Sequence, residues 1–302
     1  MTSFRWTLPH MWAPCPELRA PLQSFVIDIS FEELDYKTVI QANASEATTV
    51  RVERRGRVGI VTLNRPARRN ALSSTLIEEL PRLVTELGAD GSVDAIVLTG
   101  ADPAFCAGLD LNELGSTGDN LGLPDRPEYP WPWRVEVPVI GAINGPAVAG
   151  GFELALHCDV LLASDRALFA DTHGRVGQFP GAGLTVRLVE AVGLQRARML
   201  CLTGNFIDAA TAARWGLVVD VFSHEELLER ATGIAADIAD NDRRFARRML
   251  AHFEQLARLD RAAGMELVAE EMRTWNDDFT PDDVERRRQA VLARSLEQRS
   301  GR

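Results

Sequence analysis

The segment Val139–Ala163, VIGAINGPAVAGGFELALHCDVLLA, decides the fold. It opens with an uninterrupted run of apolar and small residues, which is typical of a strand buried on both faces of a sheet. A turn containing three glycines follows, and the apolar run from Phe152 to Leu156 then favours a helix. Because Asp159–Ala163 returns to a strand-like run, the segment predicts a strand–helix–strand crossover.

A second crossover is indicated upstream of the first. Ser73 is a good N-cap for a helix that carries leucines at three- and four-residue spacing and ends at Gly88. Pro81 predicts a kink or a short break inside this helix. Ala95–Thr99 is then a short apolar run of the kind found in buried strands. Two such units along one chain predict an α/β core.

The chain divides into three regions. Residues 1–47 have no sustained period and contain four prolines among the first 21 residues, so we interpret them as an N-terminal extension. The core is expected at 48–222, from a hairpin of Thr49–Glu53 and Val58–Leu63 to a last strand at Leu217–Val221. Residues 223–302 are charged and helix-forming, which predicts a helical C-terminal region. Within the core, helices are also expected at 184–192, 195–202 and 208–215.

Charge and cysteine content exclude several classes of protein. With 33 basic and 43 acidic residues the formal net charge is -10, so the surface as a whole does not attract nucleic acid or an anionic membrane. Lys37 is the only lysine, which excludes a P-loop and leaves little room for a Schiff-base lysine. The four cysteines form no Cys-x-x-Cys pair. Because no window approaches the ~20 apolar residues that span a bilayer, we expect a cytoplasmic protein.

Two glycine-containing turns are candidates for chemistry, because each follows a predicted buried strand and precedes a helix. They are Ala104–Leu111 and Gly145–Glu153. Free N–H groups at the start of a helix bind oxyanions. Two such turns facing one another would hold a carbonyl oxygen and stabilise the charge of an enolate or a tetrahedral adduct. The alternative is that the glycines only allow a helix to pack closely on a strand.

Four motifs occur in order along the chain: NRPARRNAL at 64–72, FCAGLD at 105–110, NGPAVAGGFELA at 144–155 and PGAG at 180–183. With the pair Cys158-Asp159, they make the chain resemble the enoyl-CoA hydratase/isomerase (crotonase) family from about Val50 to Phe222. The resemblance is looser in the C-terminal helices. It implies a spiral of ββα units, with C-terminal helices that cover the active site and build a homotrimer or a dimer of trimers.

The resemblance also implies an acyl-CoA thioester as the substrate, with no metal and with no cofactor beyond the coenzyme A that the substrate carries. Its thioester oxygen would lie between the backbone N–H groups of Leu109 and Gly150. The arginines of Arg65–Arg69 would supply a local basic patch for a nucleotide phosphate, or else form a solvated turn. The residues that the resemblance places along the CoA and acyl groups are Arg68, Asn70, Ala71, Ala107, Gly108, Asp110, Leu111 and Gly151.

The catalytic carboxylates depart from the family pattern at one position. Glu153 matches the carboxylate that the family's hydratases carry in the helix after the second glycine turn, although the helix dipole also favours a Glu there. The second carboxylate falls twenty residues later, where this chain has His173. Asp171 lies two residues before it and is the other candidate.

The resemblance favours a hydratase that adds water across a trans-2-enoyl-CoA through a thioester enolate. Glu153 would be the acid/base, and His173 or Asp171 would move the second proton. The alternatives are an enoyl-CoA isomerase with a single base, and a decarboxylase or C–C lyase that also forms an enolate. A non-catalytic acyl-CoA binder is disfavoured because Glu153 is retained.

Other side chains fit a chemical role less well. His157 follows Glu153 by four residues, but no suitable third metal ligand is spaced nearby. Cys106 has no base next to it in sequence, so we expect it to pack in the core. Three aromatic residues either line the acyl pocket or pack in the core or between subunits: Tyr129, Trp131 and Trp133.

Overall fold

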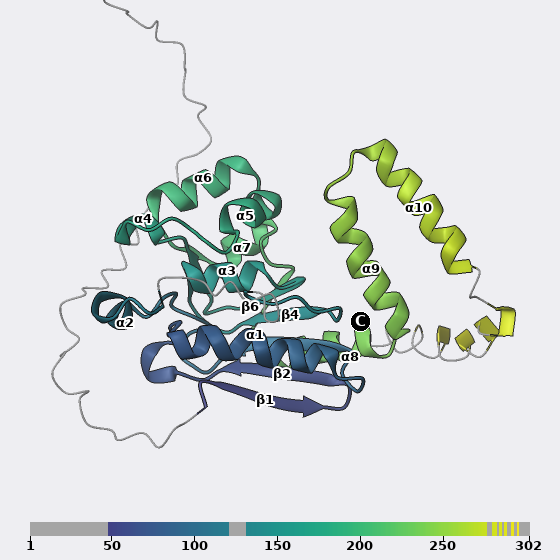
Figure 1. Cartoon of the computed structure of the whole chain (residues 1–302), viewed down its shortest axis with the longest axis horizontal. Coiled ribbons are helices and arrows are strands. Elements are labelled where there is room, and N and C mark those ends of the chain that lie inside the picture. Colours follow the sequence, from purple (N-terminus) through teal and green to yellow (C-terminus); the bar gives the residue numbers. More distant parts are fainter. Residues whose placement is uncertain are drawn as a thin grey trace, which may run out of the picture. The chain divides into compact units, whose positions relative to one another are not determined.

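The computed structural model describes residues 48–120 and 131–276, together with short stretches between 280 and 295. Its main sheet has six strands in the order β1-β2-β3-β4-β6-β9. β1 and β2 are antiparallel, and the other neighbours are parallel (Figure 1). The strands are β1 Val50–Arg55, β2 Val58–Leu63, β3 Ala95–Gly100, β4 Val139–Ile143, β6 Val160–Ser164 and β9 Asp220–Phe222.

One face of this sheet is covered by α8 (Leu227–Ala239). Leu227, Ala231 and Ala235 of this helix form a buried apolar cluster with side chains of β2, β3, β4 and β6. Small residues at a spacing of four let the helix lie close to the strands. The first helix beyond residue 222 is therefore a layer of the α/β core.

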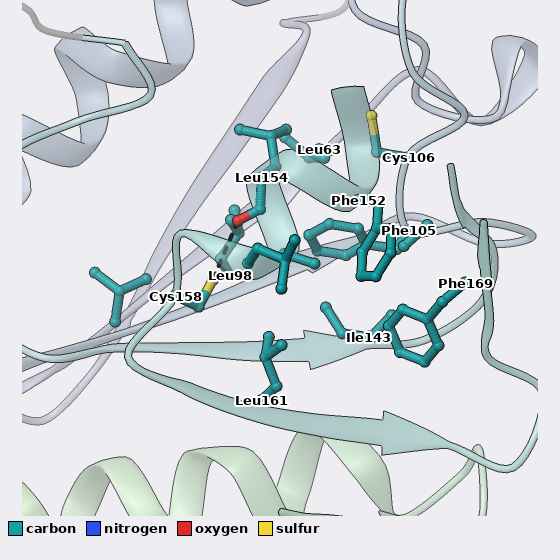
Figure 2. Close-up of a cluster of buried hydrophobic side chains, with 14 of the residues drawn as sticks. Leu63, Leu98, Phe105, Cys106, Ile143, Phe152, Leu154, Cys158, Leu161 and Phe169 are labelled. Atoms are coloured by element: carbon teal, nitrogen blue, oxygen red, sulfur yellow. Dashed lines mark hydrogen bonds between the residues drawn. The ribbon is translucent and has the colours of Figure 1, made fainter. Parts of the chain in front are cut away.

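The opposite face carries the larger apolar core, against which α1 (Ser74–Ala89) and α3 (Gly150–Leu156) pack. Figure 2 shows the aromatic centre of this core, where Phe105, Phe152 and Phe169 gather between α3 and the strands. Phe152 and Phe169 lie in tilted contact, with ring centroids 5.6 Å apart. Both glycine turns therefore rest on a packed apolar base.

A second, three-stranded sheet holds the start of α3 in place. β5 (Ala147–Val148) pairs in parallel with β7 (Leu168–Ala170), which pairs antiparallel with β8 (Ile207–Asp208). Strands of two or three residues carry no hydrophobic period, so the sequence did not predict this sheet. It brings the end of the second glycine turn next to the segment that begins at Asp171.

Two sequence-based expectations differ from the structure. α1 begins after Ser73, whose side chain caps it as predicted, but it continues through Pro81 as one unbroken helix. The last strand is Asp220–Phe222, later than the predicted Leu217–Val221. Gly216 ends α7 in the left-handed conformation, and Leu217 then turns inward to the core before pairing with β6 begins.

The hairpin and three further helices follow the predicted pattern. The hairpin of β1 and β2 is confirmed, and the helices expected at 184–192, 195–202 and 208–215 are observed to within one residue at each end. Their bounds are α5 Leu184–Val192, α6 Leu194–Thr203 and α7 Ala209–Trp215. The short helices are the 3-10 turn η1 Pro66–Arg68, α2 Leu111–Ser116 and α4 His173–Val176.

Two further helices, α9 (Arg243–Leu256) and α10 (Arg261–Asn276), complete the described C-terminal region. Arg243 forms an ion pair with Asp94 at the start of β3, and Arg248 of α9 forms an ion pair with Glu271 of α10. Over the residues that the structure describes, no helix is long and apolar enough to cross a bilayer.

Candidate active site

Glu153 lies in the first turn of α3 and is only 5% exposed. Its Oε1 accepts hydrogen bonds from the backbone N–H groups of Ala182, at 2.8 Å, and Leu184, at 3.4 Å. Burial raises the pKa of Glu153, although these two donors and His173 oppose the shift. Glu153 is therefore a fixed carboxyl group whose proton affinity is moved toward that of an acid/base catalyst.

His173 and Asp171 lie directly beside this carboxylate. The Nδ1 atom of His173 is 2.7 Å from Oδ1 of Asp171, and the His173 backbone N–H donates to the same oxygen at 3.2 Å. The other ring nitrogen, Nε2, is 3.7 Å from Oε2 of Glu153. All three side chains are buried. The structure thus brings the three predicted catalytic residues together in the order Asp171, His173, Glu153.

The charge on Asp171 fixes the orientation of the imidazole. Burial alone would raise the pKa of Asp171, but hydrogen bonds from His173 and Cys201 outweigh burial, and the pKa is lowered. The ionised carboxylate accepts a hydrogen bond from the Nδ1–H group of His173. With Nδ1 held by Asp171, Nε2 points at Glu153. A carboxylate behind a histidine has this orienting role in serine hydrolases as well.

The two glycine turns, Ala104–Leu111 and Gly145–Glu153, run side by side. The Cys106 N–H donates to the Pro146 carbonyl at 3.1 Å, and the Val148 N–H donates to the Cys106 carbonyl at 2.9 Å. These bonds make a short parallel bridge between the turns. The tips of the turns are consequently held at a fixed separation.

At the tips, Gly108 and Gly150 let the two turns approach each other closely. Gly108 has a φ of +86°, and a Cβ built on it would lie 2.8 Å from the Val148 carbonyl oxygen and 3.4 Å from the Gly150 nitrogen. Ala149 has a φ of +48°, a strained value for a residue with a side chain. Among the hydrogen bonds of the described residues, the N–H groups of Leu109 and Gly150 have no acceptor. This geometry suits the predicted oxyanion hole, whose catalytic role stays a prediction.

Close packing explains the neighbouring glycine. A Cβ on Gly151 would lie 2.1 Å from the carbonyl oxygen of Cys106, far inside van der Waals contact. Close packing therefore explains Gly151, which lets the helix approach the first turn, and also Gly108, which lies against the Val148 carbonyl. A Cβ on Gly108 would in addition contact the Gly150 nitrogen.

The arginine-rich segment contributes less free charge than the sequence suggested. Arg65 pairs with Asp110 at 2.9 Å and also donates to the Ala71 carbonyl, so its guanidinium is already engaged. Asn70 is fully buried, and its amide donates to the carbonyls of Ala101 and Ala104 at 2.7 Å each. The exposed arginines of this segment are Arg68 and Arg69.

The other residues predicted along the ligand lie in the same region. Asp110 caps α2 through the Asn112 N–H at 3.1 Å, and Leu111 is 59% exposed. Ala71 and Gly151 are buried, and Ala107 is half-buried. The structure places these residues around the two turns, and their contacts with a ligand stay predictions.

The side chains that the sequence assigned to packing do pack. Burial raises the pKa of Cys106 to about 12, which leaves no thiolate for nucleophilic attack. Burial also lowers the pKa of His157 to about 4, and its Nε2 contacts the Trp133 carbonyl at 3.0 Å. In the described ranges there is no cluster of three potential metal ligands. Trp133 is buried in the core and Trp131 packs against it, while Tyr129 lies outside the described residues.

Sequence reasoning missed two contributors to the site. Cys201 of α6 hydrogen-bonds to Asp171, and burial together with that carboxylate raises the pKa of the thiol to about 12. The N–H groups of Ala182 and Leu184 fix Glu153. The PGAG motif at 180–183 marked the position of the second pair, but nothing in the pattern around Cys201 relates it to a residue thirty positions earlier.

A family model described as enoyl-CoA hydratase/isomerase matches residues 53–295. The chain belongs to the enoyl-CoA hydratase/isomerase family. A probable mitochondrial enoyl-CoA hydratase of Dictyostelium discoideum is 41% identical over 197 residues, which cover 63% of this chain and 70% of that protein. The family model and this relative confirm the predicted class, an enzyme of the crotonase family.

Solved structures of this family confirm the predicted crotonase-like fold with its helical C-terminal region. The enoyl-CoA hydratase from Mycobacterium smegmatis has a TM-score of 0.64 and 42% identity, and the match covers 77% of this chain and 100% of that one. A monofunctional enoyl-CoA isomerase from M. smegmatis has a TM-score of 0.61 and 31% identity, over 72% of this chain and 98% of that one. The matched structures thus include proteins named for two of the reactions considered above, hydration and isomerisation.

Proposed function

We propose that this enzyme adds water across the double bond of a trans-2-enoyl-CoA. The observation that carries the proposal is the buried row of Asp171, His173 and Glu153. Glu153 lies on α3, three residues after Gly150. Two proton-transfer groups that face each other suit a reaction that moves one proton from water and another to carbon. The relatives at 41% and 42% identity named as hydratases support this choice.

The thioester oxygen accepts hydrogen bonds from the Leu109 and Gly150 N–H groups in the proposed reaction. Glu153, as the carboxylate, removes a proton from water while the water oxygen bonds to C3. The electron pair of the C2–C3 double bond shifts toward the carbonyl and forms an enolate. The two N–H groups stabilise the negative charge on its oxygen.

His173 supplies the second proton transfer. Protonated at both nitrogens, it delivers the proton on Nε2 to C2, and the enolate collapses to the saturated 3-hydroxyacyl thioester. Asp171 stabilises the charged ring before that transfer. The proton that Glu153 took from water then moves to His173 across the 3.7 Å between Oε2 and Nε2. This step restores the Glu153 carboxylate and the protonated imidazole.

Coenzyme A lies along the Arg68–Ala71 segment in this proposal. Arg68 and Arg69 are exposed there and can approach a phosphate, which suits a protein whose net charge is otherwise -10. We further propose a homotrimer or a dimer of trimers, built through α9 and α10. Phe253 of α9 is 60% exposed and Met265 of α10 is 63% exposed, which leaves apolar surface for subunit contacts.

An enoyl-CoA isomerase is the second candidate. Asp171 is bound to His173, so Glu153 is the one carboxylate of the row that is not paired with the imidazole at hydrogen-bonding distance. A single carboxylate can shuttle a proton between C4 and C2 of a 3-enoyl-CoA. The solved isomerase relative shows that the family supports this reaction.

A panel of thioesters separates these candidates. The purified protein is incubated with trans-2-enoyl, 3-enoyl and malonyl-type CoA thioesters, and the products are identified by mass spectrometry and chromatography. The proposal predicts that the trans-2-enoyl-CoA gains the mass of one water and that the malonyl-type thioester is unchanged. Conversion of the 3-enoyl-CoA alone would support the isomerase, and saturable binding without turnover of any thioester would contradict both.

A further inference from the structure

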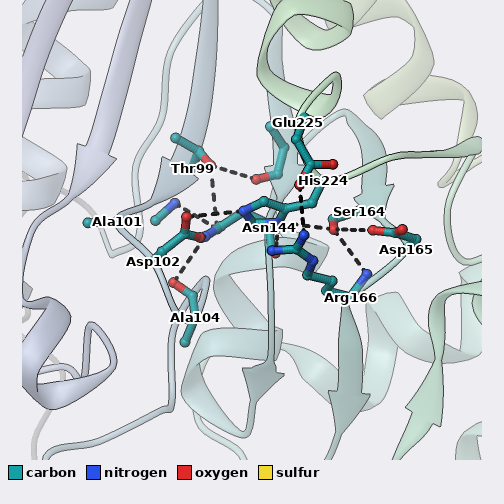
Figure 3. A network of polar contacts seen from close by, with 12 residues as sticks. Thr99, Ala101, Asp102, Ala104, Asn144, Ser164, Asp165, Arg166, His224 and Glu225 are labelled. Carbon is teal, nitrogen blue, oxygen red and sulfur yellow. Dashed lines mark hydrogen bonds and ion pairs between the residues drawn. The ribbon is translucent and has the colours of Figure 1, made fainter.

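A polar network of Asp102, Asn144 and His224 lies at the base of the two glycine turns, where the chain enters each turn. This histidine sits in the loop between β9 and α8, and its side chain is 16% exposed. Its Nδ1 is 3.1 Å from the backbone carbonyl oxygen of Asn144, and its Nε2 is 3.1 Å from Oδ2 of Asp102 (Figure 3). One ring therefore contacts both of the segments that lead into the glycine turns.

Asn144 joins the same two segments from inside. Its Nδ2 donates to Oδ1 of Asp102 at 2.9 Å, and its Oδ1 accepts from the Gly100 N–H at 3.1 Å. Gly100 ends β3, and Asn144 directly follows β4. The network thus fastens the ends of two neighbouring parallel strands to each other at the point where the turns begin.

Little chain separates this base from the proposed oxyanion hole. Asp102 precedes Leu109 by seven residues, and Asn144 precedes Gly150 by six. In between, the turns are hydrogen-bonded to each other through Cys106, and a Cβ on Gly145 would lie 2.6 Å from the Pro103 carbonyl oxygen. In a pair of short, packed and hydrogen-bonded loops, a displacement at the base is carried to the tips.

We propose that His224 is a positioning residue that sets the separation of the Leu109 and Gly150 N–H groups by clamping Asp102 to the backbone at Asn144. The proposal deepens the proposed hydration and rests on it for its effect on turnover. His224 has no part in proton transfer, because its ring faces the base of the turns and both of its nitrogens contact protein oxygens.

The chemistry of the imidazole suits a clamp between two acceptors. The two ring nitrogens lie on one rigid plane, and here Nδ1 faces a carbonyl while Nε2 faces a carboxylate. The carboxylate is ionised: burial opposes ionisation, but hydrogen bonds from Asn144 and His224 lower the pKa of Asp102. Ser164 Oγ, 3.2 Å from Nδ1, also lies against the ring.

Variants with an amide side chain at position 224 test the two contacts of the clamp one at a time. In His224→Asn the amide nitrogen falls near the position of Nδ1 and keeps the donor to the Asn144 carbonyl. In His224→Gln it falls near Nε2 and keeps the donor to Asp102. His224→Ala removes both donors. Glu225→Gln is the matched control, since the Glu225 carboxylate pairs with Arg166 at 2.7 Å, outside the turns.

The direct test measures how strongly the protein polarises a bound thioester. Butyryl-CoA labelled with carbon-13 at the carbonyl has no double bond to hydrate, so its infrared carbonyl band reports the oxyanion hole without turnover. Titration gives its Kd, and trans-2-butenoyl-CoA gives kcat in parallel.

We expect His224→Ala to reduce the band shift on binding and to lower kcat about tenfold, while the Kd changes less than about twofold. The Asn and Gln variants should each recover part of both effects, and Glu225→Gln should match the wild type.

Each outcome decides the proposal. A His224→Ala protein that melts at a lower temperature but keeps the wild-type band shift and kcat would show that His224 only stabilises the fold, and the proposal would be wrong. If His224→Ala does not fold, the same comparison is made with the Asn and Gln variants, and wild-type values in both would also overturn it. A wild-type band shift that depends on His224, without hydration of any enoyl-CoA, would support the clamp and contradict the hydratase. No band shift in the wild type would contradict the oxyanion hole and the clamp together.

Discussion

His173 stands at the position where the resemblance to the family's hydratases placed a second carboxylate, and Asp171 supports it from behind at 2.7 Å. Relative to the family pattern, the carboxylate lies two residues earlier, and an imidazole stands at the position of the second carboxylate. Glu153 keeps a fixed orientation because Ala182 and Leu184 donate to one of its oxygens and leave the other facing His173. At this scale the proposed reaction depends on one carboxylate and one oriented histidine.

Removal of the imidazole should slow hydration without loss of binding. We expect His173→Ala to lower kcat by about 10²–10³, because a positioned acid/base group contributes about that much, and Asp171→Asn to lower it less. Steady-state kinetics with trans-2-butenoyl-CoA, together with a butyryl-CoA Kd, measures both. Arg175→Gln, on the exposed side of α4, is the control. A His173→Ala enzyme with the wild-type kcat would leave Glu153 to act without it.

The raised pKa of Glu153 predicts the acid limb of the pH–rate profile. The carboxylate is the active form, so kcat/KM falls as the pH is lowered through the pKa of this group. Because burial raises that pKa, the fall should begin above the value of about 4.3 that is usual for Glu. Asp171, whose pKa is lowered, stays ionised through the same range. A profile of kcat/KM that is flat down to about pH 4.5 would contradict this.

At the scale of elements, the site is positioned by short pieces that connect long ones. The sequence predicted β3, β4, α3 and β6 because each has an apolar run or a helical spacing long enough to recognise. It did not predict β5, β7, β8 or α4, whose two to four residues have no period. The pairing of β5 with β7 is what brings His173 to Glu153. The residues of the site were therefore predictable from the resemblance, whereas their contacts depend on pairings between distant segments.

The junction of α3 with the first turn should not tolerate a side chain. Gly151→Ala places a Cβ 2.1 Å from the Cys106 carbonyl, so the helix must move, and we expect a loss of about 1–3 kcal/mol in the free energy of unfolding. Gly233→Ala, at an exposed position of α8 with nothing within 4 Å of its Cβ, should instead gain about 0.5–1 kcal/mol. Urea unfolding followed by circular dichroism compares the two. Equal stability of both variants would show that the close approach at Gly151 is unimportant.

At the scale of the whole molecule, the described C-terminal region has two parts. α8 is a layer of the core, whereas α9 and α10 expose apolar side chains such as Phe245, Phe253, Met265 and Met272. Exposed apolar surface of this kind is typical of subunit contacts. The sequence shows a helical apolar spacing in this region, at Phe245, Met249, Leu250 and Phe253. The sequence did not show that α8 packs on the sheet while α9 and α10 keep exposed apolar side chains.

The proposed assembly predicts a mass of three or six times the 33.2 kDa subunit. Phe253→Asp with Met265→Asp introduces charge on exposed apolar positions of α9 and α10 and should shift the protein to a smaller species. Light scattering after size exclusion measures the mass. Gln255→Asp adds a charge to the same helix without loss of apolar surface and should keep the wild-type mass. A wild-type protein that is a monomer would contradict the assembly.

The central claim is that Glu153 acts on water during hydration of an enoyl thioester, and the most direct measurement is kcat/KM for trans-2-butenoyl-CoA in the wild type and in Glu153→Gln. The amide keeps the size of the side chain and removes its basicity. We predict a fall in kcat/KM of about 10²–10⁴, with a butyryl-CoA Kd within about twofold of the wild type. Unchanged hydration by a folded Glu153→Gln enzyme would contradict the proposed mechanism.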